Sequence, residues 1–222
     1  MKVSCIVTAF NEEKNVSNVL EVLIKSPLLD EIIVVDNGSK DSTAQIVKDK
    51  FPKIRLITKK NNQGKAGGMF LGAKKAKDPI LFFCDADLTN LQIHHIEKLI
   101  LPVIKGKTRM VVGAQEFMNV FKKQSDEKMT DFIQGLGGEK VLFKKDFFAI
   151  PDIQSSKYAV EYKIINFFEK NNWPFKKIIL KKVGHVHKIK KWGINGIFIE
   201  IGTWYIFLSQ FVARLIRKKK VL

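Results

Sequence analysis

The stretch ILFFCDADL, residues 80–88, joins an apolar run directly to two carboxylates, Asp85 and Asp87. An apolar run without polar alternation is typical of a strand buried on both faces. Side chains two apart in an extended chain point the same way, so the two carboxylates would repel each other unless a cation lies beside them. The stretch therefore predicts a buried strand that ends at a cation, although an ordinary turn with Asp87 as a helix cap is the simpler alternative.

Three further apolar strands precede this one, and helical segments separate them. The expected strands are VSCIVTAF (3–10), EIIVVDNGS (31–39) and KIRLITK (53–59), and the expected helices are 11–26, 40–51 and 61–77. Near-continuous apolar strands alternating with helices predict an α/β fold with a mostly parallel sheet covered on both faces.

The second half of the chain is less regular. We expect helices at 91–104 and 157–172, strands at 109–115, 139–148 and 175–189, and a polar loop or short helix at 116–136. His94 and His95 fall on the first of these helices and are expected at the surface. With no long linker and no repeat, the simplest organisation is a single domain, residues 1–195, followed by a C-terminal segment, residues 196–222.

Composition limits the class of protein. The 222 residues include 39 Lys and Arg against 22 Asp and Glu, which gives a net charge of +17. This excess indicates an anionic partner, such as nucleic acid, a membrane surface or phosphorylated substrates. Cys5 and Cys84 both lie in apolar runs, so we expect small core residues and a reducing, cytoplasmic setting. The N-terminus does not read as a signal peptide.

Polar residues follow each of the first four strands. Because ligands of an open parallel sheet bind beyond the carboxyl ends of its strands, these residues are expected to form one site. They are Thr8, Ala9, Asn11 and Glu12 after the first strand, Asp36 and Gly38 after the second, Gly64 and Lys65 after the third, and Asp85 and Asp87 after the fourth.

The order and spacing of VTAFNEEKNV, EIIVVDNGSKDST, NQGKAGGMFLGAKKA and ILFFCDADL resemble the family-2 glycosyltransferases, in particular their dolichyl-phosphate-mannose-synthase-like and glucosyl-phosphoglycerate-synthase-like members. The resemblance implies a Rossmann-like, glycosyltransferase A-type domain. In it, residues 1–115 would bind a nucleotide sugar and residues 116–195 the acceptor. GGEKVLFKK, residues 137–145, is similar to an acceptor-side segment of the family, with Lys140 where Arg is usual.

The resemblance also implies roles for the residues at the strand ends. Those after the first two strands would bind the nucleoside of a UDP- or GDP-sugar. Gly64 and Lys65 would meet the diphosphate. Asp85 would face the ribose or the metal, and Asp87 would bind Mg²⁺ or Mn²⁺ and take part in catalysis.

Histidines and a glutamate of the second half extend the expected site. Subfamilies similar to this chain supply a histidine metal ligand near VGHVHK, so His185 and His187 are both candidates, although either could be an ordinary interior or surface residue. Glu161 is a candidate catalytic or sugar-binding carboxylate, needed as a base only if the acceptor is not already a phosphate. The family's processive motif is absent, so we expect a single-transfer enzyme. Inversion is the family majority, yet the histidine-bearing subfamilies include retaining enzymes.

The C-terminal segment combines a wide apolar arc with a basic end. Residues 196–220 place Glu200 and Arg214 on a narrow polar face, which argues against a membrane span. An amphipathic helix at an anionic membrane surface, burial against the domain, or a homodimer contact all fit this pattern. The first predicts a peripheral protein on the inner face of the cell membrane and an acceptor that is a lipid or lipid phosphate.

Two other classes of function fit parts of the sequence. A sugar nucleotidyltransferase shares the layout but needs a glycine-rich turn with Arg directly after the first strand, where this chain has TAFNEEKN. A nucleic-acid-binding protein would suit the charge, but no recognised binding motif is present and the basic residues are spread along the chain. The sequence thus favours a nucleotide-sugar transferase without a nucleic-acid partner.

Overall fold

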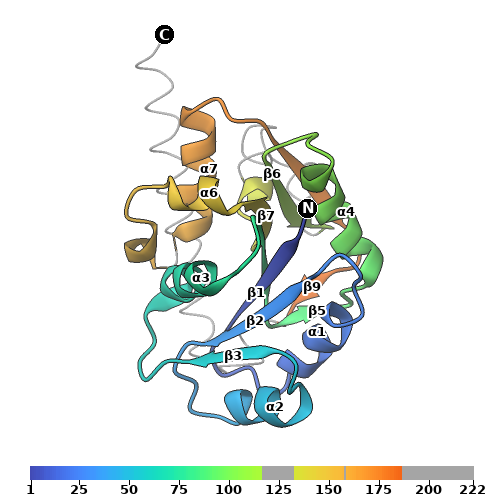
Figure 1. Cartoon of the computed structure of the whole chain (residues 1–222), viewed down its shortest axis with the longest axis vertical. Coiled ribbons are helices and arrows are strands. Elements are labelled where there is room, and N and C mark those ends of the chain that lie inside the picture. Colours follow the sequence, from blue (N-terminus) through green and yellow to red (C-terminus); the bar gives the residue numbers. More distant parts are fainter. Residues whose placement is uncertain (117–132, 158, 187–222) are drawn as a thin grey trace.

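A seven-stranded sheet organises the computed structural model, which describes residues 1–116, 133–157 and 159–186 (Figure 1). Its strand order is β3-β2-β1-β4-β7-β6-β8. The strands β1 to β4 pair in parallel, as do β6 and β8, while β7 runs antiparallel to both of its neighbours. Their bounds are β1 Val3–Ala9, β2 Glu31–Asp36, β3 Arg55–Thr58, β4 Ile80–Asp85, β6 Met110–Gln115, β7 Glu139–Phe143 and β8 Phe175–Leu180. The predicted α/β fold with a mostly parallel sheet is confirmed.

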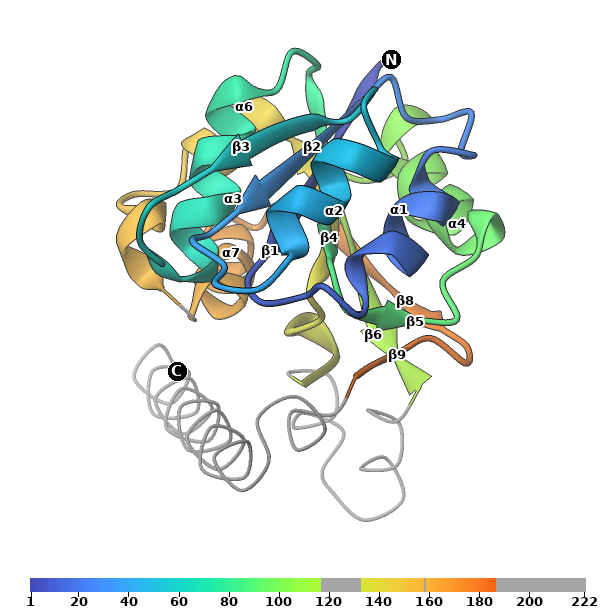
Figure 2. The same ribbon diagram turned by 90° about the horizontal axis from the view of Figure 1, so that it is seen from below.

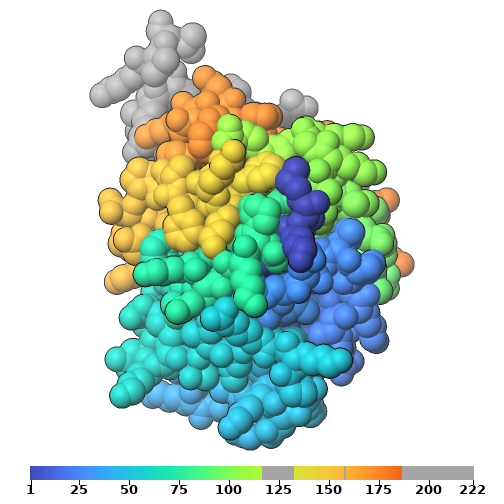
Figure 3. Space-filling model, in the orientation of Figure 1, coloured from blue at the N-terminus to red at the C-terminus, as the bar shows by residue number. Residues whose placement is uncertain are grey.

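Helices cover both faces of this sheet (Figure 2). One core cluster joins the sheet to α1 (Val16–Leu23), α2 (Thr43–Lys50) and α4 (Ile93–Ile104). The other joins it to α3 (Gly64–Lys75), α6 (Lys144–Phe148), the 3₁₀ helix η2 (Ile153–Ser156) and α7 (Val160–Lys170). Because both faces are covered, the strands can be apolar throughout. On the face shown in the space-filling view, the dark-blue start of the chain forms a small patch among later segments (Figure 3).

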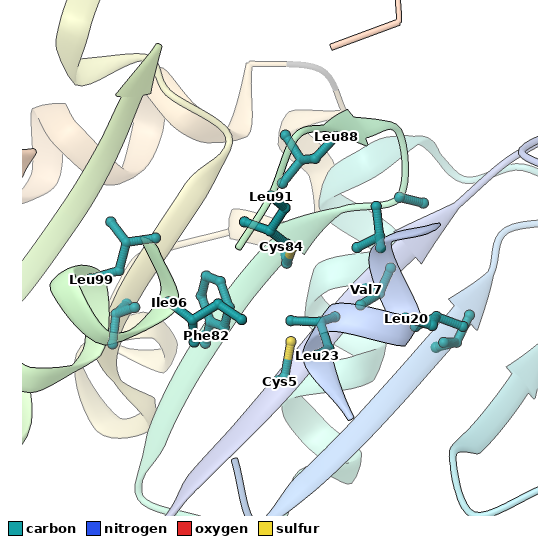
Figure 4. Packing of buried hydrophobic residues seen from close by; sticks show 14 of the residues in the cluster. Cys5, Val7, Leu20, Leu23, Phe82, Cys84, Leu88, Leu91, Ile96 and Leu99 are labelled. Carbon is teal, nitrogen blue, oxygen red and sulfur yellow. The ribbon is translucent and has the colours of Figure 1, made fainter. Parts of the chain in front are cut away.

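The two cysteines belong to the first of these core clusters. Cys5 and Cys84 are both buried, free thiols among Val7, Leu23 and Phe82 (Figure 4). Burial raises the pKa of each thiol well above its ordinary value, so both stay protonated and behave as small apolar side chains. The prediction that they are core residues is confirmed.

Several predicted elements are shorter than the sequence pattern suggested. The first helix begins at Val16 and not at residue 11, because Asn11 has a φ of 56° and the carbonyl of Glu12 accepts the amides of Asn15 and Val16. The segment 139–148 is not one strand but β7 followed by α6. The amide of Lys144 still donates to the carbonyl of Pro79 at 2.8 Å, beside the last strand pair Ile80–Phe143, and α6 begins at this residue.

The prediction for the histidine pair was wrong for His95, which is only 4% exposed. It lies in the first turn of α4, where its Nδ1 accepts the backbone amide of Gln92 at 3.2 Å and caps the helix. Burial and the neighbouring charges of His94 and Lys98 lower the pKa of His95, so the uncharged ring that can accept this bond is favoured.

A small second sheet lies beyond β4. It pairs β5 (Leu88–Thr89) with β9 (Gly184–His185), so the expected strand 175–189 is divided into β8 and β9. Leu88 stands opposite His185, and the amide of Val186 donates to the carbonyl of Asp87 at 3.2 Å. This short ladder connects the end of β4 to a segment about a hundred residues later in the chain.

The predicted C-terminal helix with its basic tail, the homodimer contact considered for it, and His187 all lie outside the described residues. The division into halves at residue 115 and the boundary at residue 195 stay predictions. Within the described ranges, no helix is both long enough and apolar enough to cross a membrane.

The packing of α3 on β1 yields a prediction about stability. A Cβ on Gly72 would lie 2.4 Å from Cγ2 of Ile6, in the middle of the second core cluster. Overpacking of this kind typically costs about 1–3 kcal/mol, more than the roughly 1 kcal/mol that alanine gains over glycine in a helix. We expect Gly72→Ala to lower the free energy of unfolding in urea, whereas Lys75→Ala on the exposed face stays within about 0.5 kcal/mol of wild type. A more stable Gly72→Ala protein would contradict the packing described.

Candidate functional site

The carboxyl ends of β1, β2 and β4 meet at one edge of the sheet. The parallel register places Thr8 beside Asp85 and Ala9 beside Asp36. A pocket of about 240 Å³ opens there. Its lining residues are Thr8, Ala9, Phe10, Glu12, Asn37, Asn62, Lys65, Asp85, Ala86 and Asp87. Six of these were assigned roles from the sequence. Phe10, Asn37 and Asn62 belong to the same strand ends, and Ala86 lies between the two aspartates.

Four other residues expected at the nucleoside or diphosphate hold the surrounding turns and do not line this pocket. The side chain of Asn11 accepts the amide of Lys40 at 2.8 Å. The carboxylate of buried Asp36 accepts both the hydroxyl and the amide of Ser39. Gly38 and Gly64 have φ values of 83° and 77°, in the left-handed region that favours glycine. Their assignment to donor binding stays a prediction.

Lys65 lies between two carboxylates from distant parts of the chain. Its Nζ is 2.6 Å from Oδ1 of Asp85 and 2.8 Å from Oε1 of Glu161. Burial disfavours the ammonium, but the charges of Asp85 and Glu161 outweigh it and hold the pKa of Lys65 well above its ordinary value. Lys65 is therefore a fixed positive charge at the pocket wall. Glu161, in the first turn of α7, is brought to the site as the sequence predicted.

His185 reaches the other side of Asp85 from β9. Its Nε2 lies 3.1 Å from Oδ2 of Asp85 and 3.7 Å from Oδ1 of Asp87. One ligand atom from each of these three residues falls within 4.8 Å of the other two, which is the spacing of a metal-binding group. An imidazole with two carboxylates is a donor set that suits Mn²⁺ and other first-row divalent ions.

The charges around His185 fix its state in the absence of an ion. Burial alone would lower its pKa, but the hydrogen bond to Asp85 and the charges of Glu139, Asp85 and Asp87 raise the pKa of His185 to about 9. The Lys65 ammonium and the His185 ring likewise hold the pKa of Asp85 well below its usual range, despite burial. The protonated ring of His185 is thus itself a cation surrounded by the carboxylates of Asp85, Asp87 and Glu139.

Sequence reasoning missed two buried side chains behind the pocket. The side-chain Nε2 of Gln115, at the end of β6, lies against Nδ1 of His185. Glu139, at the start of β7, is completely buried, and its Oε1 lies 3.7 Å from Nε2 of His185. Burial raises the pKa of Glu139 to about 6. The GGEK segment resembles a segment of the family, but nothing in its spacing indicates that Glu139 faces a histidine of β9.

The glycine turn before β7 forms one wall of the site. A Cβ on Gly138 would lie 2.3 Å from Oδ2 of Asp85 and 3.0 Å from Nζ of Lys65, so a side chain there would displace the charged groups. Beneath the turn, Nζ of buried Lys140 donates to the carbonyl of Gly137. Burial lowers the pKa of Lys140 to about 8. Lys140 therefore holds in place the glycine turn that packs against Asp85.

Comparison with known proteins identifies the family. The family model "Glycosyl transferase family 2" matches residues 4–183, about four fifths of the chain, so the chain belongs to this family. This confirms the resemblance inferred from the strand-end motifs.

Relatives with assigned names cover the chain only in part. The chain is 32% identical over 124 residues to a 4,4'-diaponeurosporenoate glycosyltransferase of Staphylococcus haemolyticus, covering 54% of this chain and 33% of the relative. It is 29% identical over 164 residues to a dolichyl-phosphate beta-glucosyltransferase of Trichomonas vaginalis, covering 67% and 48% respectively. The matches thus span about half or less of these relatives' own lengths.

The fold is shared with solved structures. A glucosyl-3-phosphoglycerate synthase from Mycobacterium tuberculosis, in complex with Mn²⁺, uridine-diphosphate-glucose and phosphoglyceric acid, superposes with a TM-score of 0.71. The match covers 95% of this chain and 79% of the synthase at 20% identity. The expected glycosyltransferase A-type fold is thereby confirmed.

The state of His185 leads to a prediction about pH. Its folded pKa, about 9, lies above the ordinary value of 6.5, so its contribution to stability is complete below about pH 6.5 and disappears as the pH rises through about 9. We expect the stability of wild type relative to His185→Gln, measured by urea unfolding in EDTA, to fall across this interval. A difference that is constant between about pH 6 and pH 10 would show that the ring does not carry charge among the carboxylates.

Proposed function

We propose that this protein transfers a sugar from a nucleoside-diphosphate sugar to an acceptor that carries a phosphate or carboxylate, with Mg²⁺ or Mn²⁺ at Asp85, Asp87 and His185. The observation that carries the proposal is the position of Asp85. Its carboxylate contacts Lys65 on one side and His185 on the other, at the edge of the strand-end pocket. A family-2 glycosyltransferase with this arrangement would have an ammonium group to bind a diphosphate and a site for a divalent cation.

The pocket lining offers groups for both the nucleoside and the diphosphate of the donor. The nucleoside would contact Thr8, Ala9, Glu12, Asn37 and Asn62. Lys65, held by Asp85 and Glu161, would pair with the diphosphate. A hydrogen bond from an ammonium that stays protonated is stronger than one between neutral groups. The structural neighbour from Mycobacterium tuberculosis binds UDP-glucose, so UDP is the first nucleotide to test.

The residues of the site fit a divalent cation. Three carboxylates surround Nε2 of His185, and neither side-chain oxygen of Glu139 has a hydrogen-bond partner among the described residues. An ion bound there would supply positive charge to the departing diphosphate. The chain's own part is to hold Asp85 and Asp87 at the end of β4 and to bring His185 to them through the β5–β9 ladder.

The acceptor class follows from a feature that the relatives and the structural neighbour share. Two relatives are named for a diaponeurosporenoate and a dolichyl phosphate, and the neighbour binds phosphoglyceric acid; each of these compounds carries an ionisable oxygen. Where the attacking oxygen is itself ionised, as in a lipid phosphate, no general base is needed. Glu161, whose Oε1 is 2.8 Å from Nζ of Lys65, would then keep Lys65 in place and contact the sugar instead of taking a proton. A lipid phosphate and a small phosphate are the two choices within this class, and a small phosphate that attacks through a hydroxyl would need Glu161 as its base.

The test is a transfer assay with UDP-glucose or GDP-mannose as donor and dolichyl phosphate or 3-phosphoglycerate as acceptor. We expect product with one such pair in Mn²⁺ and none in EDTA. Asp87→Ala should lose transfer and the Mn²⁺-dependent part of UDP affinity by calorimetry, while its unfolding transition is retained, because its carboxylate lies at the pocket rim. Unchanged UDP affinity of Asp87→Ala in Mn²⁺ would exclude the metal assignment.

The place of action is also a proposal. The wide apolar arc and basic end of residues 196–220 support peripheral attachment to an anionic membrane surface, where a lipid phosphate would be within reach. We expect the full chain to co-sediment with vesicles containing anionic lipid at low salt, and a chain ending at Gly196 to remain in the supernatant. If both remain in the supernatant, a small phosphate becomes the better acceptor candidate.

A further inference from the structure

The structure contains a buried carboxylate that accepts no hydrogen bond from the described residues. Glu139 is 0% exposed, and neither Oε1 nor Oε2 has a hydrogen-bond partner within the described part of the chain. Other buried carboxylates are satisfied. Asp146 accepts two bonds from Arg109 at 3.0 and 2.6 Å, and Asp78 accepts the hydroxyl of Ser4 at 2.9 Å. A buried carboxylate without a hydrogen bond is costly to keep, which suggests that its charge serves the site.

The carboxylate of Glu139 lies beside the candidate metal-binding group. Its Oε1 lies 3.7 Å from Nε2 of His185, the same nitrogen that is 3.1 Å from Asp85 and 3.7 Å from Asp87. Three carboxylates therefore converge on one imidazole nitrogen. A single N–H can satisfy only one of them, and in this structure its hydrogen bond goes to Asp85. A divalent ion in place of that proton would offset the charge of all three.

We propose that Glu139 is a positioning residue of the cation site, whose buried negative charge sets the affinity of Asp85, Asp87 and His185 for a divalent ion. It acts on the ion through the field of a buried site, since the compact ligand group consists of the other three residues. The inference rests on the proposed function, because it needs the ion that function invokes. It adds a residue of β7 that contributes charge without being a ligand.

The surroundings of Glu139 explain why a buried charge can be effective there. Gly113 stands opposite it on β6, and a Cβ on Gly113 would lie 3.0 Å from Cβ of Glu139. The side chain therefore begins in a packed wall, and with 0% exposure its carboxylate is shielded from water. In such a place a charge interacts strongly with an ion a few ångströms away, whereas water would screen it at the surface.

The experiment compares Glu139→Gln, which removes the charge but keeps the shape, with wild type. Mn²⁺ alone is titrated into the full-length protein, with free Mn²⁺ followed by electron paramagnetic resonance, and thermal unfolding is recorded in EDTA. We expect Mn²⁺ affinity to fall about 10- to 100-fold. In EDTA we expect the melting temperature to be unchanged or higher, because a buried charge that accepts no hydrogen bond has been removed. A purely structural glutamate would instead lower the melting temperature and leave the Mn²⁺ affinity unaltered.

Asp78→Asn is the matched control, since Asp78 is a buried carboxylate at the opposite end of the sheet. It should keep wild-type Mn²⁺ affinity. If Glu139→Gln does not fold, Glu139→Asp, which keeps the charge on a shorter side chain, should retain measurable but weaker binding. Equal Mn²⁺ affinities of wild type and Glu139→Gln would overturn the inference alone. No Mn²⁺ binding by wild type would overturn both the inference and the metal dependence of the proposed function.

Discussion

The site depends on the concentration of negative charge where the strands end. Asp85, Asp87, Glu139 and Glu161 approach one another there, and within the described part of the chain Lys65 and His185 are the cationic side chains that contact them. Like charges at these separations are tolerated only with cations between them. This is why Lys65 remains an ammonium and His185 an imidazolium despite burial, and why the site is ready to exchange a proton for an ion.

Backbone packing keeps the charges from moving apart. On one side Gly138 lies so close to Asp85 that no Cβ fits between them, and the buried Lys140 supports that turn from below. On the other side, the pairing of Leu88 with His185 fixes the ring relative to β4. Because both contacts come from segments far away in the sequence, the site can form only when the antiparallel strand β7 and the β5–β9 ladder are in place.

The sequence predicted the fold and the strand-end residues of the site, because both follow from the pattern of apolar and polar residues. Apolar strands with polar ends indicate both the sheet and the edge where ligands are expected, and Thr8, Lys65, Asp85 and Asp87, grouped on this basis, line one pocket in the structure. Glu139 and Gln115 could not be found this way, because their partner His185 is set by a two-residue ladder with no pattern of its own. His95 was misjudged because a helix cap buries a side chain that periodicity alone assigns to the surface.

The acidic site lies in a protein of strongly positive net charge, and the two have opposite effects on an anionic ligand. Under the proposed function, a net charge of +17 would attract nucleoside diphosphates and ionised acceptors from solution, yet a purely basic pocket would hold both products after transfer. Carboxylates at the strand ends would avoid this, because they would bind the diphosphate only through the cations beside them. How firmly those cations are held would then depend on how many carboxylate charges face them, so the buried Glu139 would tune binding and release without touching either substrate.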